Sequence, residues 1–213
     1  IANDPNENGW KDTVRISPLE DTIVAVRPVT PKLPFEIPNS IRELNPMMPD
    51  GSPDMFNNVD VQGNPTTAIT NKLVNFGWEY VYHCHILSHE EMDMMRPVSY
   101  VLPPTKANGL ARTVDAAGKI TISWVDNSIS ETGYLVQRSA NGTTWVDVGT
   151  SDSPLDQPNT KGSVRSVVDG VAGAAAADQY RVVARNTVGY GGQFPSMTAQ
   201  SLYYLEPGAL QHK

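Results

Sequence analysis

The sequence has 213 residues, of which 39% are apolar and 18% charged, so it can form one large globular domain or two of ordinary size. Its formal net charge of -7 argues against nucleic acid or an anionic membrane as the main partner. No stretch reaches the roughly 18 apolar residues of a membrane-spanning helix, and a single cysteine excludes an internal disulfide.

Residues 10–29 alternate apolar and polar side chains on both sides of a Ser-Pro pair. Alternation with a period of two is typical of a half-buried strand, and serine followed by proline is typical of a turn. The pattern predicts two strands joined by a turn, with four apolar side chains facing inward: Val14, Ile16, Ile23 and Val26.

The next stretch, residues 31–75, is rich in proline and asparagine. Because proline cannot donate a hydrogen bond to a sheet, we expect a long ordered insertion over the surface. Strand patterns return at 78–86 (WEYVYHCHI) and at 96–102 (RPVSYVL), whereas residues 103–109 (PPTKANG) are typical of a linker.

Short strand patterns separated by turn residues recur after the linker, and no helical period is present. We therefore expect an all-β chain with a first domain at 1–102, a β-sandwich at 110–202 and a tail at 203–213.

The segment YVYHCHILSHEEMDMM, residues 80–95, contains the cysteine and three of the four histidines. Neighbouring side chains on a strand point to opposite faces. If Cys84 points to one face, His83 and His85 both point to the other. The tripeptide can therefore serve two separate metal sites on opposite sides of one strand.

Cys84, His89 and Met94 follow the spacing C-x4-H-x4-M. A thiolate, an imidazole and a weakly bound thioether are ligands of a blue-copper electron-transfer site, which also needs one more histidine. A zinc site usually has a closed tetrahedral set with paired cysteines or histidines, and a cysteine nucleophile needs one base nearby. The spacing favours copper over both alternatives.

The motif HCHILSHEEMDMM resembles the C-terminal copper signature of multicopper oxidases, H-C-H-x3-H-x4-[ML], and NGWKDTV and GWEYVYHCHILSHE are similar to the segments that flank it. The resemblance covers about residues 6–102 and implies a cupredoxin-like Greek-key β-barrel, which this chain alone leaves incomplete. Members often have a glycine where this chain has Asp93.

In this family Cys84, His89 and Met94 would bind type-1 copper, and His83 and His85 would each bind one of two type-3 coppers. The resemblance implies that a phenol, an aromatic amine or a metal ion gives up electrons at type-1 copper. They would pass through Cys84 to His83 and His85 and reduce O2 to water at a trinuclear cluster. A secreted, periplasmic or cell-surface location is also implied.

The trinuclear cluster of this family needs eight histidines, and this chain supplies two. His212, which follows a whole further domain, is a poor candidate for the missing type-1 ligand. We therefore expect a C-terminal fragment or subunit of a multicopper oxidase, active only with an N-terminal companion chain that supplies the other histidines.

Residues from about 108 to 202 resemble a fibronectin type III domain, an Ig-like β-sandwich, with Trp124 in the core on the second strand. Tyr134 and Tyr180 would lie on the third and sixth strands. The resemblance favours a spacer or stabilising domain over one that binds a polysaccharide or a surface.

Two other functions stay open. One is a blue-copper electron carrier or reductase subunit without a trinuclear cluster, although His83 and His85 together argue against it. The other is a secreted copper-binding adhesion module.

Overall fold

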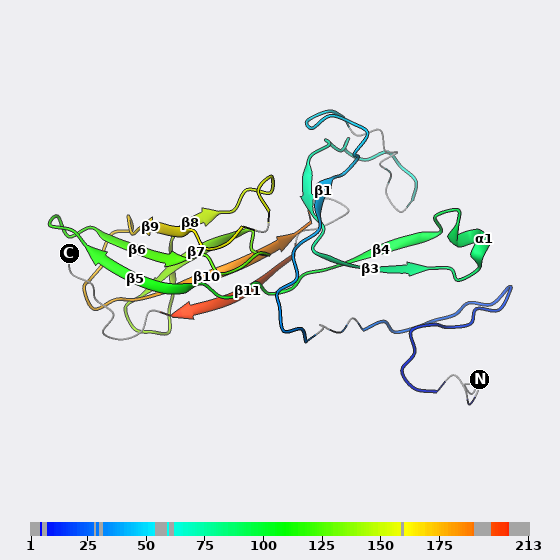
Figure 1. The fold of residues 1–213 in the computed structure, drawn as a ribbon, viewed down its shortest axis with the longest axis horizontal. Helices are drawn as coiled ribbons and strands as arrows, with labels where there is room; N and C mark the ends of the chain where they lie inside the picture. The colour runs from blue at the N-terminus through cyan, green and yellow to red at the C-terminus, as the bar shows by residue number, and fades with distance from the viewer. Residues whose placement is uncertain are drawn as a thin grey trace. The chain divides into compact units, whose positions relative to one another are not determined.

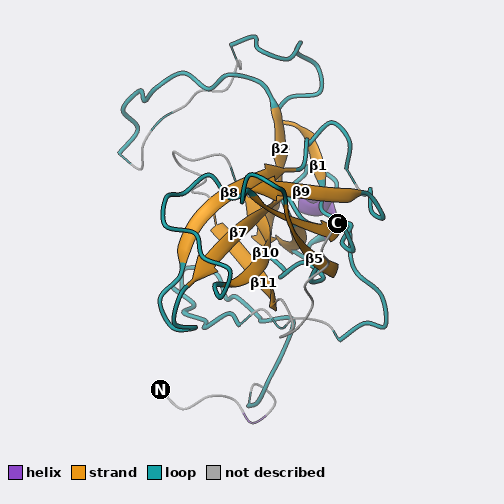
Figure 2. Ribbon diagram, turned by 90° about the vertical axis from the view of Figure 1, so that its left-hand side faces the viewer, coloured by secondary structure: helices purple, strands orange, loops and turns teal. Residues whose placement is uncertain are grey.

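The computed structural model describes residues 5, 8–27, 29, 32–53, 59, 62–158, 160–189 and 197–204. The chain divides into two compact units, residues 1–31 and 32–213. The described residues are all-β apart from one short helix, as Figure 2 shows. No helix among them is long and apolar enough to cross a membrane.

The first unit differs from the sequence prediction. Residues 8–27 and 29 contain no strand, so the prediction of two strands at 10–29 is wrong, although the expected turn is present at residues 18–19. Side chains predicted to face inward are open to solvent: Ile23 is 96% exposed and Val26 75%. Two strands alone are marginal in water, because they have no further surface on which to bury their apolar face.

In the second unit, residues 32–102 form two antiparallel pairs of strands (Figure 1). The first pair joins β1 (Ile41–Glu43) to β2 (Leu73–Asn75), so the proline-rich stretch contributes both strands of a small sheet and ends with the second. The second pair is a hairpin of β3 (Trp78–His83) and β4 (Met95–Tyr100), with the helix α1 (Leu87–Glu90) in its connecting loop.

Two antiparallel sheets make up the sandwich, one of three strands in the order β5-β6-β9 and one of four in the order β11-β10-β7-β8. The strands are β5 (Asn108–Val114), β6 (Ile120–Val125), β7 (Gly133–Ser139), β8 (Val146–Asp152), β9 (Val164–Val168), β10 (Gln179–Val188) and β11 (Met197–Tyr204). The expected linker at 103–109 therefore overlaps the start of β5. The expected tail lies outside the described residues from position 205 onward.

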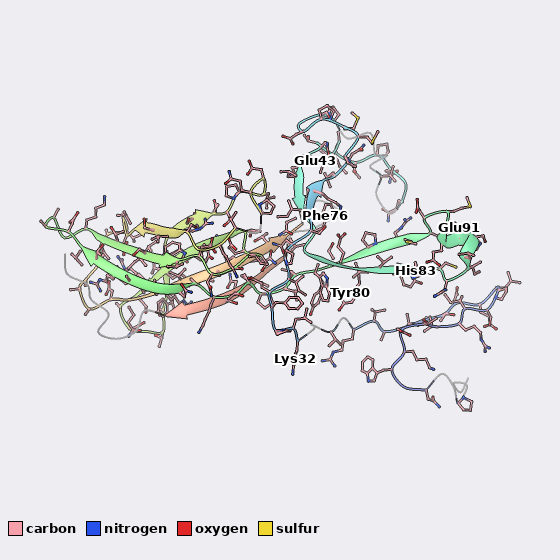
Figure 3. All side chains as sticks on the ribbon, in the orientation of Figure 1. Lys32, Glu43, Phe76, Tyr80, His83 and Glu91 are labelled. Atoms are coloured by element: carbon pink, nitrogen blue, oxygen red, sulfur yellow. The ribbon has the colours of Figure 1, made fainter. Side chains whose placement is uncertain are left out.

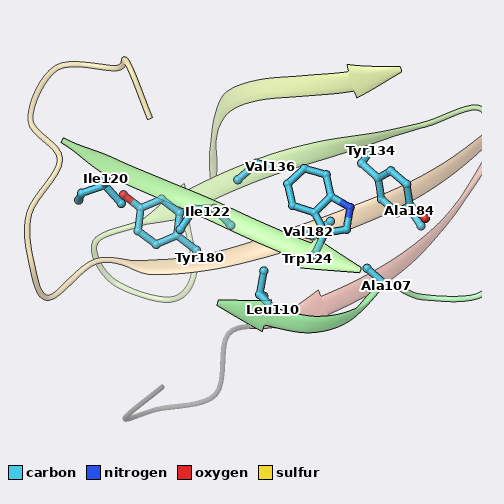
Figure 4. Close-up of a cluster of buried hydrophobic side chains, with 10 residues drawn as sticks. All are labelled: Ala107, Leu110, Ile120, Ile122, Trp124, Tyr134, Val136, Tyr180, Val182 and Ala184. Atoms are coloured by element: carbon cyan, nitrogen blue, oxygen red, sulfur yellow. The ribbon is translucent and has the colours of Figure 1, made fainter. Parts of the chain in front are cut away.

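The hydrophobic core lies between these two sheets (Figure 4). Trp124 on β6 and Tyr134 on β7 are fully buried, and their ring centroids are 5.4 Å apart. Tyr180 on β10 is also buried, and its hydroxyl donates to Asp169 at 2.7 Å. The three aromatic residues lie on the second, third and sixth strands of the sandwich, as the sequence predicts.

A buried acidic pair lies where β6 gives way to the loop before β7. The Asp126 carboxylate accepts a hydrogen bond from the Tyr134 hydroxyl at 2.7 Å, and it forms an ion pair with Arg165 at 2.9 Å. Glu131 is 3.7 Å from Arg165 and accepts from the Ser153 hydroxyl at 2.7 Å. Burial, with the nearby charge of Asp126, raises the pKa of Glu131 to about 7.

We expect Glu131 to make the sandwich less stable as the pH rises from about 4.5 to about 7. The folded state keeps the Glu131 proton over this range while the unfolded chain loses it, so ionisation favours unfolding. Glu131→Gln should remove about 1–2 kcal/mol of this pH dependence after allowance for solvent screening. Urea unfolding at pH 5 and pH 7.5 measures it.

The control is Asp156→Asn, which removes an exposed carboxylate from the same domain. It should leave the pH dependence as in the wild type. An equal loss of pH dependence in both variants would contradict the assignment to Glu131.

Candidate metal centre

The hairpin of β3 and β4 determines where the histidine- and cysteine-rich motif lies. Its strands pair from Trp78 opposite Tyr100 to His83 opposite Met95, so residues 84–94 form the closing loop. The Cys84 amide donates to the Met94 carbonyl at 3.4 Å, which continues the pairing by one step. His83 and Glu91 mark this end of the hairpin in Figure 3.

Helix α1 turns the loop back on itself. The Met94 amide donates to the His89 carbonyl at 3.0 Å, and the Glu91 amide donates to Leu87 at 2.9 Å. This turn brings His89 to Cys84, with 3.5 Å between the Cys84 Sγ and the His89 Nδ1. The Cys84 thiol is not part of a disulfide, and the residue is partly exposed.

This separation fits two ligands of one metal ion. With bonds of about 2.3 Å to sulfur and about 2.0 Å to nitrogen, tetrahedral ligands lie about 3.5 Å apart. The same distance suits a thiol–imidazole hydrogen bond, so the two side chains are compatible with either state. The donor chemistry, a soft thiolate beside an imidazole, suits copper.

His83 and His85 form a second group. Their ring centroids are 5.5 Å apart with planes inclined by 36°. The His83 Nδ1 lies 3.2 Å from the Cys84 carbonyl oxygen. A carbonyl only accepts, so in the tautomer that makes this hydrogen bond Nδ1 carries the hydrogen and Nε2 has the lone pair that can bind a metal.

The strand ends sooner than the sequence predicts. β3 stops at His83, so Cys84 and His85 follow the strand and do not lie within it. The two histidine rings nevertheless lie side by side, and Cys84 instead approaches His89. The opposite facing of Cys84 and the two histidines stays a prediction, because strand alternation does not extend past His83.

Met94 contacts Cys84 and His89 through its backbone. Its carbonyl accepts from Cys84, while its side chain is exposed. In the part of the chain that the structure describes, no group of three or more histidine, cysteine, aspartate or glutamate side chains converges as a metal site. Of the three residues expected at type-1 copper, the structure brings the side chains of Cys84 and His89 together, whereas Met94 contacts this pair through its backbone.

Asp93 has the backbone angle φ 57°, which lies in the left-handed region. Glycine adopts this region freely, and aspartate tolerates it better than most other residues. The family's frequent glycine and this chain's aspartate therefore suit the same turn.

Asp93→Gly should strengthen the turn before Met94, and Asp93→Val should weaken it by about 1–3 kcal/mol, because a β-branched residue is strained at this φ. Hydrogen exchange of the Met94 amide, which bonds to His89, measures the local opening.

The matched control is Glu91→Gly, two residues earlier, where φ is -63°. Glycine should weaken the loop there, because it gains no conformational relief and adds freedom to the unfolded chain. Equal effects of glycine at both positions would contradict the role given to the left-handed turn.

Comparison with known protein families gives a match over the region that contains the hairpin. Residues 42–101 match the family model described as multicopper oxidase. The match includes β3, β4 and the loop with all five candidate ligands. Residues 42–101 are therefore similar to a region of multicopper oxidases. This supports a cupredoxin-like fold, copper binding and oxidoreductase chemistry in general. Neither a curated protein nor a solved structure matches the chain.

The match also includes most of the proline-rich stretch, where the sequence resemblance is weakest. Arg42 on β1 forms a bidentate ion pair with Glu79 on β3, at 2.7 and 2.9 Å, and its guanidinium lies 3.9 Å from the centre of the Phe76 ring. Part of this stretch is therefore attached to the strand that leads to His83. Sequence reasoning missed this pair, because the partners are 37 positions apart.

Asn71, also in this stretch, is fully buried. Its side-chain oxygen accepts from the Asn45 amide at 2.9 Å, and its side-chain nitrogen donates to the carbonyls of Asn45 and Met48 at 3.0 and 2.8 Å. One side chain thus holds the turn that follows β1. Asparagine is common in loops, so its sequence context did not reveal this buried role.

Proposed function

We propose that this chain is the C-terminal fragment or subunit of a multicopper oxidase that acts with an N-terminal companion chain. Its reducing substrates would be phenols, aromatic amines or metal ions, with O2 as the acceptor. The observation that carries the proposal is the approach of Cys84 to His89 beside the paired rings of His83 and His85, within the family-matched residues.

The ligand assignment follows from the side-chain chemistry. Cys84 and His89, with Met94 as a weak third ligand, would hold type-1 copper, and His83 and His85 would contribute to the trinuclear cluster. Copper supplies one-electron redox chemistry at both places. Cys84 is bonded through the backbone to both histidines, so the peptide itself links the two sites covalently.

The faces of the β3–β4 hairpin support a companion chain. Val81 is 56% exposed and Tyr82 60%, and Val98 on β4 is exposed as well. No other described strand pairs with β3 or β4. A two-stranded hairpin is marginal by itself, so apolar side chains on both strands favour an obligate partner that covers them.

The sandwich would serve as a fibronectin type III-like spacer or stabilising domain. Its strand order, with the first, second and fifth strands in one sheet and the others in the second, supports this proposal. The family resemblance also leads us to propose a secreted, periplasmic or cell-surface location.

Cys84→Ser should abolish both the blue absorption and the oxidation of phenols, since the thiolate–copper bond gives the colour and the electrons enter there. The variant is measured in the complex with the companion chain, by visible absorption and oxygen uptake.

Met92→Leu is the matched control, because Met92 is an exposed thioether in the same loop and is not a candidate ligand. It should keep both properties. Phenol oxidation that persists in Cys84→Ser would disprove the proposed electron route.

The chain alone should not hold a complete set of four coppers, because it contributes only two of the eight cluster histidines. Copper analysis and the near-ultraviolet band of the coupled copper pair, with and without the companion chain, test this. Full occupancy in the isolated chain would refute the need for a companion. A blue band without the near-ultraviolet band in the assembled protein would favour the electron-carrier alternative.

A further inference from the structure

We propose that the sandwich fixes the orientation of the β3–β4 hairpin. Asn186 is the positioning residue, because it binds next to the start of β3 and next to the end of β4. The inference concerns the protein without metal, so it does not depend on the proposed oxidase activity.

Asn186 on β10 is fully buried, and its side-chain amide makes four hydrogen bonds. The oxygen accepts from the side-chain nitrogens of Asn75 at 3.0 Å and Asn39 at 3.2 Å. The nitrogen donates to the Asn39 side-chain oxygen at 2.9 Å and to the Leu102 carbonyl at 3.0 Å. These bonds use both donors and both lone pairs of the amide.

Two of these partners flank the hairpin. Asn75 ends β2, just before the turn into β3, and Leu102 follows the end of β4. Asn75 is itself fixed: its side chain accepts from the Gly77 amide at 2.8 Å and donates to the Thr187 carbonyl at 2.8 Å. One buried side chain of the sandwich therefore binds next to both strands of the hairpin.

Gly77 shows independently how closely these elements approach. It has φ 67°, and an added Cβ would lie 2.6 Å from the Tyr100 carbonyl oxygen and 2.8 Å from a methyl carbon of Val188. Real Cβ atoms do not come so close to such atoms. The turn into β3 thus requires glycine, because it touches both the end of β4 and the sandwich.

Glu36 forms a second connection on the same side of the sandwich. Its carboxylate accepts from the Ile129 amide and the Ser130 hydroxyl, each at 2.8 Å, from the Thr105 amide at 3.0 Å and from the Ser128 hydroxyl. Burial raises the pKa of Glu36, but these hydrogen bonds outweigh it and lower the pKa overall. The carboxylate therefore stays ionised and keeps its four bonds at neutral pH.

The segment expected to be a linker takes part in this joint. Thr105 donates to Glu36, and Pro104 and Ala107 are buried. Domains on one chain move against each other by default unless their interface is well made. Here the hydrogen bonds of Asn186 and Glu36 fix the connection to the sandwich, where the sequence predicts a flexible linker.

The test uses spin labels on the metal-free 213-residue chain. Cys84, the only cysteine, carries one label near the end of the hairpin, and Thr150→Cys on the exposed side of β8 carries the other. We expect a narrow distance distribution. Asn186→Ala should broaden it, because the variant removes the hydrogen bonds that Asn186 makes to the half-buried Asn39 side chain, the buried Asn75 side chain and the Leu102 carbonyl.

Hydrogen exchange reports the same event at the joint. The Gly189 amide donates to the Asn75 carbonyl at 2.9 Å. In Asn186→Ala it should exchange about tenfold faster or more, as expected for the loss of buried hydrogen bonds. Amides of β6 and β7 in the sandwich core should keep their protection.

The control is Asn127→Ala, because Asn127 is a partly exposed asparagine of the sandwich whose side chain makes one long hydrogen bond, 3.4 Å, to the Lys106 carbonyl and none to Asn186 or Glu36. It should leave the distribution narrow. If Asn186→Ala does not fold, Glu36→Gln should broaden the distribution in its place. The proposal is wrong if the distance distribution has the same width in the wild type and in Asn186→Ala. It is also wrong if Asn186→Ala lowers the protection of the β6 and β7 amides as much as that of the Gly189 amide.

Discussion

The antiparallel pairing of β3 with β4 is the constraint on which the candidate metal centre depends. Because His83 pairs with Met95, residues 84–94 have to close a loop, and one helical turn within that loop returns His89 to Cys84. All five candidate ligands therefore lie on one short piece of chain. Their relative positions need little from the rest of the fold, whereas the direction of the hairpin as a whole depends on what holds its ends.

This division explains which features the sequence could predict. The candidate ligands are close in sequence, and the H-C-H spacing is specific, so they could be proposed without a structure. Trp124, Tyr134 and Tyr180 could be assigned to strands because residues from about 108 to 202 resemble a fibronectin type III domain, and that resemblance is carried by local strand and turn patterns. The strands expected at 10–29 failed for the opposite reason: a period of two shows that a segment could pair, but not that a partner is present.

The contacts of Asn186 and Glu36 that connect the hairpin to the sandwich could not be predicted from local sequence patterns. Asn39 and Asn186 are 147 positions apart, and asparagine or proline in a loop usually indicates a turn at the surface. The sequence PPTKANG had the composition of a linker, and composition does not show that a distant carboxylate, Glu36, binds the Thr105 amide. Buried amide networks are therefore the part of this fold that only a structure reveals.

The distribution of buried side chains suggests why this joint is polar. The clustered hydrophobic core belongs to the sandwich, whereas the hairpin exposes apolar residues such as Val81 and Tyr82. An apolar contact is non-directional and would allow the hairpin to slide or turn at its base. Hydrogen bonds are directional, and an amide with all four bonds made permits one arrangement. A hairpin held in this way presents its exposed faces in a defined direction before any partner covers them.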